Sequence, residues 1–77
     1  MRHFLEKLDL RNIPCPRNAS KALMFLSTLD TDEIVEILLD DGEPIENVPS
    51  SLEIEGHKIM ERHFVDQIYW KITVRAA

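Results

Sequence analysis

The 77-residue sequence is poor in cysteine, glycine and cations, and it contains no long apolar run. Its single cysteine excludes a disulfide within the chain and suits a reducing compartment. No stretch approaches the roughly 20 apolar residues that cross a bilayer, and residues 1–7 are too short and too charged for a secretory signal. We therefore expect a cytoplasmic protein without membrane insertion.

Cations are in the minority, since nine Lys and Arg stand against fourteen Asp and Glu and give a formal net charge of −5. An acidic domain binds phosphates poorly, so we expect no direct contact with nucleic acid unless the fold gathers a local basic patch. The three histidines have no zinc-ligand spacing to Cys15, and we expect no metal site. Nothing around Asp40 and Asp41 resembles a catalytic pocket, so a hydrolase with paired carboxylates is not expected.

What the sequence does contain is a succession of strand and helix patterns whose total length fits one domain, residues 1–77. A chain of this size buries only about 60% of its unfolded surface, so a small core is expected. The expected spans are strand 4–11, helix 16–28, strand 33–39, helix 45–55, and strands 58–64 and 67–75. This order predicts an α+β fold, a two-layer α/β sandwich with two helices on one face of a four-stranded mixed sheet.

Apolar spacing assigns a buried side to these elements. The 33–39 strand is rich in β-branched residues and is expected to direct Val35, Ile37 and Leu39 into the core. The 16–28 helix has an apolar stripe, bordered by Phe25, and a solvated side opposite it. The stripe is Ala19, Ala22, Leu23, Leu26 and Leu29, and the solvated side is Arg17, Lys21, Met24 and Thr28.

The second helix contains a proline, and the last strand shows a regular alternation of apolar and polar residues. Pro49 lies inside the 45–55 helix, so either its first turn is irregular or the regular helix begins there. Gly56 is a suitable terminating residue. Apolar contacts are expected from Ile45, Val48, Leu52 and Ile54 of this helix. In the 67–75 strand, Ile68, Trp70, Ile72 and Val74 alternate with Tyr69, Lys71, Thr73 and Arg75.

The only cysteine, Cys15, lies between Pro14 and Pro16 at the junction of the first strand and the first helix. Asn12 can adopt the left-handed bend that ends the strand, and Pro16 suits the first helical position. The free N–H groups and positive dipole of a helix start favour a thiolate over a thiol. Most free cysteines are buried and unreactive, but two prolines at a helix start are a poor setting for a packing residue.

Two neighbouring motifs carry a family resemblance. Leu8-Asp9-Leu10-Arg11 followed by Pro14-Cys15-Pro16 resembles the signature of the TusA-like sulfur-carrier family, LDxRG, a short spacer, then CPxP. The family often has a basic residue where Lys21 stands. Asp40-Asp41 resembles the family's acidic pair, and Val48-Pro49 resembles its Asp-Ile-Pro segment. Gly56-His57 resembles its Gly-His pair, so the resemblance covers about residues 8–75.

The resemblance implies a persulfide carrier without metal or organic cofactor. Such proteins receive sulfane sulfur from a cysteine desulfurase or a rhodanese-like donor and pass it to a thiol of an acceptor protein. The best known pathway is 2-thiolation of the tRNA wobble uridine, and other members serve related sulfur trafficking. The relay resembles thiol–disulfide exchange, which depends on thiolate fraction, nucleophilicity and access. A monomer is the expected state, because a relay protein must expose its thiol.

The chain departs from the family pattern at several positions. Asn18 replaces the second proline of CPxP, which should loosen the first helical turn, but its amide can donate a hydrogen bond to sulfur. Asn12 replaces glycine, Asn47 replaces aspartate, and Leu23 and Met24 stand where basic residues are common. These changes concern the partners more than the cysteine chemistry. They leave a second interpretation open, a non-catalytic interaction or regulatory module that kept the fold.

The sequence thus predicts Cys15 as the catalytic residue and a set of supporting positions around it. Arg11 and Lys21 are either solvated charges or a frame for the thiol, and Met24 is either an isolated exposed side chain or a docking contact. Asp40 either caps a turn or contacts a partner. The supporting set is Arg11, Pro14, Pro16, Arg17, Asn18, Lys21, Met24 and Asp40.

Overall fold

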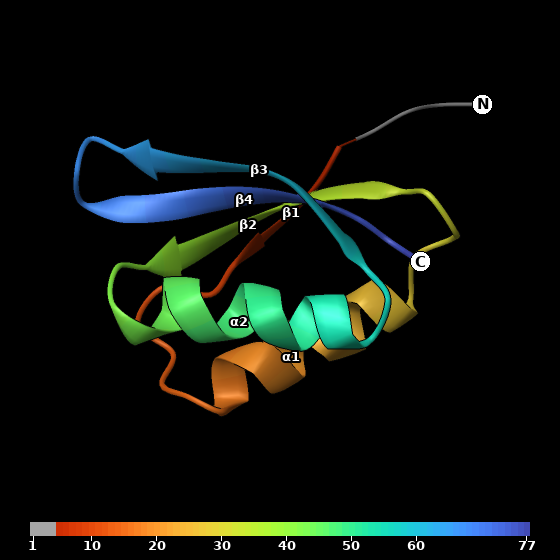
Figure 1. Ribbon diagram of the computed structural model, residues 1–77, viewed down its shortest axis with the longest axis horizontal. Helices are drawn as coiled ribbons and strands as arrows, with labels where there is room; N and C mark the ends of the chain where they lie inside the picture. The colour runs from red at the N-terminus through yellow and green to blue at the C-terminus, as the bar shows by residue number, and fades with distance from the viewer. Residues whose placement is uncertain (1–4) are drawn as a thin grey trace.

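The computed structural model describes residues 5–77, and six elements follow one another along them in the predicted order (Figure 1). They are β1 (Glu6–Asp9), α1 (Arg17–Ser27), β2 (Ile34–Asp40), α2 (Glu43–Ile54), β3 (Lys58–Val65) and β4 (Tyr69–Arg75). The predicted first strand began at residue 4, which lies outside the described residues. None of the helices is long and apolar enough to span a membrane within residues 5–77.

The four strands form one mixed sheet in the order β1-β2-β4-β3. The β1 and β2 strands are parallel because α1 crosses between them, and the other two neighbouring pairs are antiparallel. Both helices lie on the same side of the sheet (Figure 1). The fold is therefore the expected α+β two-layer sandwich.

The core lies between the central strands and the two helices. Val35, Ile37 and Leu39 of β2 are completely buried, and Ile37 pairs in register with Ile72 of β4. The strand alternates buried and half-buried residues along its whole length, as a strand with one face against helices must. The helices add the buried side chains of Ala22, Leu26, Ile45, Val48 and Leu52. The predicted core of β2 and α1 is confirmed.

The start of α1 differs by one residue from the expectation. Pro16 is the N-cap rather than the first helical residue, since its carbonyl accepts the first intrahelical bond, from the Ser20 N–H at 3.1 Å. The solvated side of the helix is as predicted, with Arg17, Lys21 and Met24 exposed.

The second helix begins earlier than predicted and tolerates its internal proline. It starts at Glu43, after a turn at Gly42 whose φ of 93° favours glycine, and Pro49 lies buried inside it. The absence of a proline N–H removes one helical hydrogen bond, and burial of the ring offsets part of that cost. Both predicted alternatives are therefore wrong, since the first turn is regular and the helix begins before Pro49.

Two apolar residues, one expected in the core and one expected in a strand, are exposed instead. Ile54 is 81% exposed because it is the last residue of α2 and projects past the core. Ile68 is 70% exposed because β4 begins only at Tyr69. The preceding turn uses positive φ at both Asp66 and Gln67, and the Ile68 N–H donates back to the Val65 carbonyl at 2.9 Å. Alternation alone extended the strand by two residues too many.

Candidate functional site: an exposed thiol at the start of α1

The loop from Arg11 to Pro16 carries the cysteine and makes few hydrogen bonds of its own. Two of its six residues are prolines without an N–H. Asn12 turns the chain with a φ of 68°, as its sequence position predicted. The Cys15 thiol is free and exposed at the tip of this loop, just before α1.

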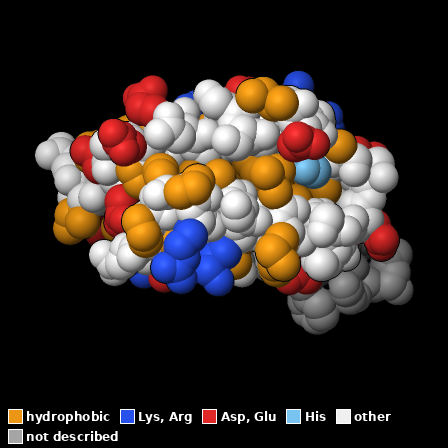
Figure 2. Space-filling model, turned by 90° about the horizontal axis from the view of Figure 1, so that it is seen from below, with side chains coloured by type: hydrophobic (Ala, Val, Ile, Leu, Met, Phe, Trp, Pro, Cys, Tyr) orange, Lys and Arg blue, Asp and Glu red, His pale blue; other side chains and the backbone are white. Residues whose placement is uncertain are grey.

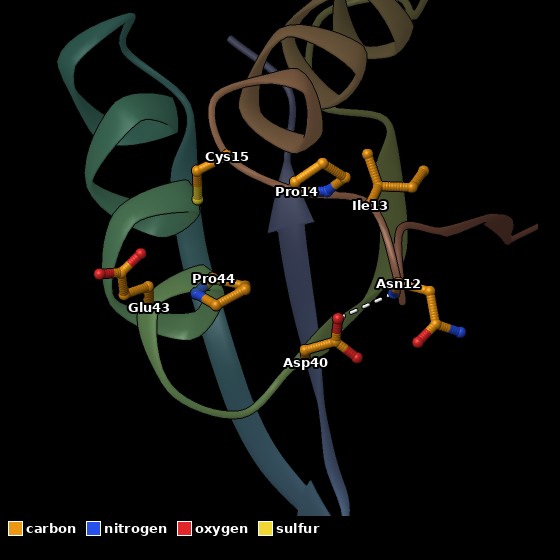
Figure 3. A pocket seen from close by; sticks show the side chains of 7 residues that line it. All are labelled: Asn12, Ile13, Pro14, Cys15, Asp40, Glu43 and Pro44. Atoms are coloured by element: carbon orange, nitrogen blue, oxygen red, sulfur yellow. Dashed lines mark hydrogen bonds between the residues drawn. The ribbon is translucent and has the colours of Figure 1, made fainter.

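Two carboxylates hold the beginning of the loop. The Arg11 N–H donates to Asp9 Oδ1 at 3.0 Å, and the Asn12 N–H donates to Asp40 Oδ2 at 2.8 Å. The second bond joins residues 28 positions apart, and it ties the loop to the end of β2 (Figure 3). Asp40 therefore holds the loop backbone, a role the sequence did not predict, and its contact with a partner stays a prediction.

The thiol faces an open groove of about 460 Å³. One wall is the cysteine loop, and the other is the end of β2 with the first turn of α2. In Figure 3 the Cys15 sulfur points into the space between them. The lining residues are Asn12, Ile13, Pro14, Cys15, Asp40, Glu43 and Pro44. Such a groove leaves the sulfur accessible to a reactive group carried by another protein.

Asn18 holds the sulfur from the protein side. Its side chain is completely buried, and its Nδ2 donates a hydrogen bond to Cys15 Sγ at 3.3 Å. Its Oδ1 accepts from the Ala19 N–H at 2.7 Å, and its own N–H donates to the Pro14 carbonyl at 3.1 Å. The predicted hydrogen bond to sulfur is thus present. Asn18 also gives the first turn of α1 bonds that a proline at this position cannot make.

Arg11 does not line the cysteine groove. Its guanidinium forms a two-pronged pair with Asp9, at 3.0 Å and 2.8 Å, and its centre lies 4.4 Å from the centroid of the Tyr69 ring. These hydrogen bonds lower the pKa of the Asp9 carboxyl and raise that of Arg11, so both stay charged at neutral pH. Arg11 lies in a second hollow that shares Asn12 and Asp40 with the groove.

Arg17, Lys21 and Met24 lie along the exposed side of α1 that begins beside the thiol. Met24 is 70% exposed. Neither Arg17 nor Lys21 takes part in the ion pairs that residues 5–77 form. Figure 2 looks onto the helix layer and shows Lys and Arg side chains gathered next to exposed hydrophobic ones. The structure brings these three residues onto one surface without any contact to the sulfur itself.

Glu43, Pro44 and Tyr69 are site residues that the sequence did not single out. Glu43 and Pro44 reach the groove because α2 begins at Glu43, two residues before its predicted start. Tyr69 lines the second hollow, where it stands opposite Asp40 in the β2–β4 register, and only the structure shows this pairing. Among residues 5–77, no three His, Cys, Asp or Glu side chains come close enough to hold a metal ion.

The Asp40 contact can be tested with its neighbour as a matched control. Asp40→Ala removes the acceptor of the Asn12 N–H, so we expect faster hydrogen exchange at that amide and a loss of about 1 kcal/mol in unfolding free energy. Asp41→Ala removes the same charge but breaks a different bond, from Trp70 Nε1 at 2.9 Å. It should leave Asn12 exchange unchanged. Equal exchange at Asn12 in both variants and the wild type would contradict the assignment.

Fold and site together define a class: small two-layer α/β proteins that present one exposed thiol at a helix start. The family model described as sulfurtransferase TusA matches residues 6–76, which is nearly the whole chain. The protein therefore belongs to the TusA family.

Relatives in sequence agree with this assignment, and two similar solved structures share the fold. Two proteins of Archaeoglobus fulgidus, named as candidate sulfur carrier proteins, are 29% and 26% identical over 70 and 68 residues. These matches cover 91% and 88% of this chain, and 80% and 92% of the relatives. A SirA-like protein of Desulfitobacterium hafniense has the same fold, with a TM-score of 0.81, 22% identity and coverage of 95% and 99%. A Helicobacter pylori protein solved in solution aligns with a TM-score of 0.75, 20% identity and coverage of 92% and 96%.

Proposed function

We propose that this protein is a sulfur carrier that holds sulfane sulfur as a persulfide on Cys15 and passes it to a thiol of an acceptor protein. The observation that carries the proposal is the exposed Cys15 thiol in an open groove, with a buried amide donor on its sulfur. Family membership and the names of the two archaeal relatives support it.

The chemistry consists of two exchanges in opposite directions. In loading, the Cys15 thiolate attacks the terminal sulfur of a persulfide on the donor protein. A bond forms between Sγ and that sulfur, and the donor cysteine leaves as a thiolate. In delivery, an acceptor thiolate attacks the same sulfur and Cys15 leaves. Each step exchanges one S–S bond for another, so access and thiolate character govern its rate.

This chemistry indicates the class of protein to which each partner belongs. The donor is a cysteine desulfurase or a rhodanese-like protein, and the acceptor is a protein with a reactive thiol. We place the relay in the cytoplasm, in tRNA thiolation or related sulfur trafficking, with the carrier as a monomer. Transient contacts of this kind suit a small protein that offers its thiol on a surface loop.

The exposed side of α1 is the docking surface in this proposal. Arg17 and Lys21 supply positive charge on the helix that follows the thiol, and Met24 supplies an adaptable apolar side chain. Met24→Asp should weaken binding of the sulfur donor about 10-fold, because it places a charge in a desolvated contact. The measurement is titration calorimetry. Thr28→Asp, farther along the same side, is the control, and equal affinity of both variants and the wild type would remove Met24 from the contact.

The carrier role is tested by intact-mass analysis of the protein after incubation with a cysteine desulfurase and cysteine. We expect a gain of one sulfur atom, located on the peptide that contains Cys15 and removed by a thiol reductant. Unchanged mass with several desulfurase and rhodanese-like donors would overturn the proposal. It would favour an interaction or regulatory module that retained the fold.

A further inference from the structure

We propose that Asn18 is a catalytic residue of sulfur delivery, in which its amide stabilises the Cys15 thiolate as that thiolate leaves. This inference rests on the proposed carrier function. The family motif has a proline at the position of Asn18, and proline has no side-chain donor. The contact is thus a feature of this chain's own sequence.

The orientation of the amide is determined by its neighbours. Asn18 is the one polar residue among residues 5–77 that is fully buried, so water cannot compete for its side chain. The Ala19 N–H needs an acceptor, and Asn18 Oδ1 lies 2.7 Å from it. The amide nitrogen is consequently turned the other way, toward Cys15 Sγ at 3.3 Å. A donor, not an acceptor, faces the sulfur before any partner arrives.

A hydrogen-bond donor binds Sγ more strongly in the leaving thiolate than in the persulfide. In the persulfide, Sγ is bonded to the terminal sulfur and carries little charge. When the acceptor thiolate attacks the terminal sulfur, a new S–S bond forms, the bond to Sγ breaks and its electron pair remains on Sγ. Hydrogen bonds to a charged atom are roughly twice as strong as those to a neutral one. The Asn18 contact therefore strengthens as the leaving group develops, which lowers the barrier to delivery.

The same contact has the opposite effect when Cys15 is the nucleophile. The thiolate is then the starting state, and a donor that stabilises it reduces its reactivity, as the lower nucleophilicity of less basic thiolates shows. Asn18 thus favours release of sulfur over its uptake. A purely structural role in the first turn of α1 would change both reactions in the same direction, and this difference makes the inference testable.

The test measures both reactions on chemically loaded protein. Wild type, Asn18→Pro and Asn18→Asp are given a persulfide with polysulfide, and cyanide is added. Cyanide takes the terminal sulfur as thiocyanate and releases the Cys15 thiolate. We expect thiocyanate formation to slow by about 10- to 100-fold in Asn18→Pro, the factor for a lost hydrogen bond to a charged atom. Alkylation of the unloaded thiolate by iodoacetamide at alkaline pH should be as fast as in the wild type or faster.

Asn18→Asp protects the test against a folding defect. An aspartate keeps the shape of the side chain and the acceptor for the Ala19 N–H, and a carboxylate suits the first turn of a helix. When ionised it has no donor for sulfur, so cyanolysis should slow in this variant also. Cyanolysis within about 2-fold of the wild type in a folded variant, or a parallel fall in both reactions, overturns the inference. Because polysulfide supplies the sulfur, failure of desulfurase loading would refute the carrier function without affecting this result.

Discussion

Cys15→Ser should abolish sulfur loading completely, with no gain of mass after incubation with a cysteine desulfurase and cysteine. The chain has one cysteine, so the variant has no other thiolate that can attack a persulfide. A serine hydroxyl has nearly the same size but is scarcely ionised near neutral pH. The Cys15 side chain is exposed, so the free energy of unfolding should change by less than about 0.5 kcal/mol.

Moving the thiol to another site tests whether sulfur loading depends on the position of the thiol or only on its presence. In the double variant Cys15→Ser, Ser27→Cys, the thiol moves to an exposed position at the far end of α1, away from the groove. This variant should react with iodoacetamide but should take no sulfur from the desulfurase. Loading of the relocated thiol at the wild-type rate would show that the groove contributes nothing to sulfur uptake by the proposed carrier.

Ile37→Ala should produce the largest loss of stability among single core substitutions in β2. Ile37 is completely buried at the middle of the central strand, where it pairs with Leu8 of β1 and Ile72 of β4. Truncation removes buried apolar surface and leaves a cavity, at a cost of about 2–5 kcal/mol. Small domains have about 5–15 kcal/mol in total. We expect the melting temperature to fall by at least about 8 °C, given about 4–8 °C per kcal/mol.

Ile54→Ala is the matched control for this prediction. It makes the same chemical change at a side chain that is 81% exposed at the end of α2. The unfolding free energy should change by less than about 0.5 kcal/mol, because little apolar surface leaves the interior. Similar melting temperatures for the two variants would mean that the assignment of core and surface is wrong.

Much of the fold was predictable because its signals are local. Buried and half-buried residues alternate along β2, so Val35, Ile37 and Leu39 could be assigned to the core from sequence spacing. The turn at Asn12 and the helix after Pro16 depend on backbone preferences of single residues, which no distant contact has to supply. The ends of the elements depend on turn geometry, which apolar alternation does not reveal. Ile68 continued the apolar alternation, but a turn with two positive φ angles took precedence.

The candidate site also has a part that the sequence predicts and a part that only the tertiary structure shows. Cys15, its prolines and the Asn18 contact lie within four residues of one another, and the sequence alone indicated a thiol at a helix start with an amide nearby. The groove could not be predicted from the sequence, because residues far apart in the chain form it. Asp40 holds the Asn12 N–H across 28 positions, and Glu43 and Pro44 approach the thiol because β2 and α2 meet the loop in space.

By itself, therefore, the sequence determined which sulfur atom lies at the start of a helix, the order of the elements and the buried side of β2, because these depend on neighbours in the chain. Only the tertiary structure decided the surroundings of that atom. Parallel pairing of β1 with β2 brings the cysteine loop to the end of β2, where Asp40 can hold it. In the sequence, Asn18 is only a replacement for proline. In the structure it is a fixed hydrogen-bond donor, because its complete burial excludes the water that would otherwise compete for its amide.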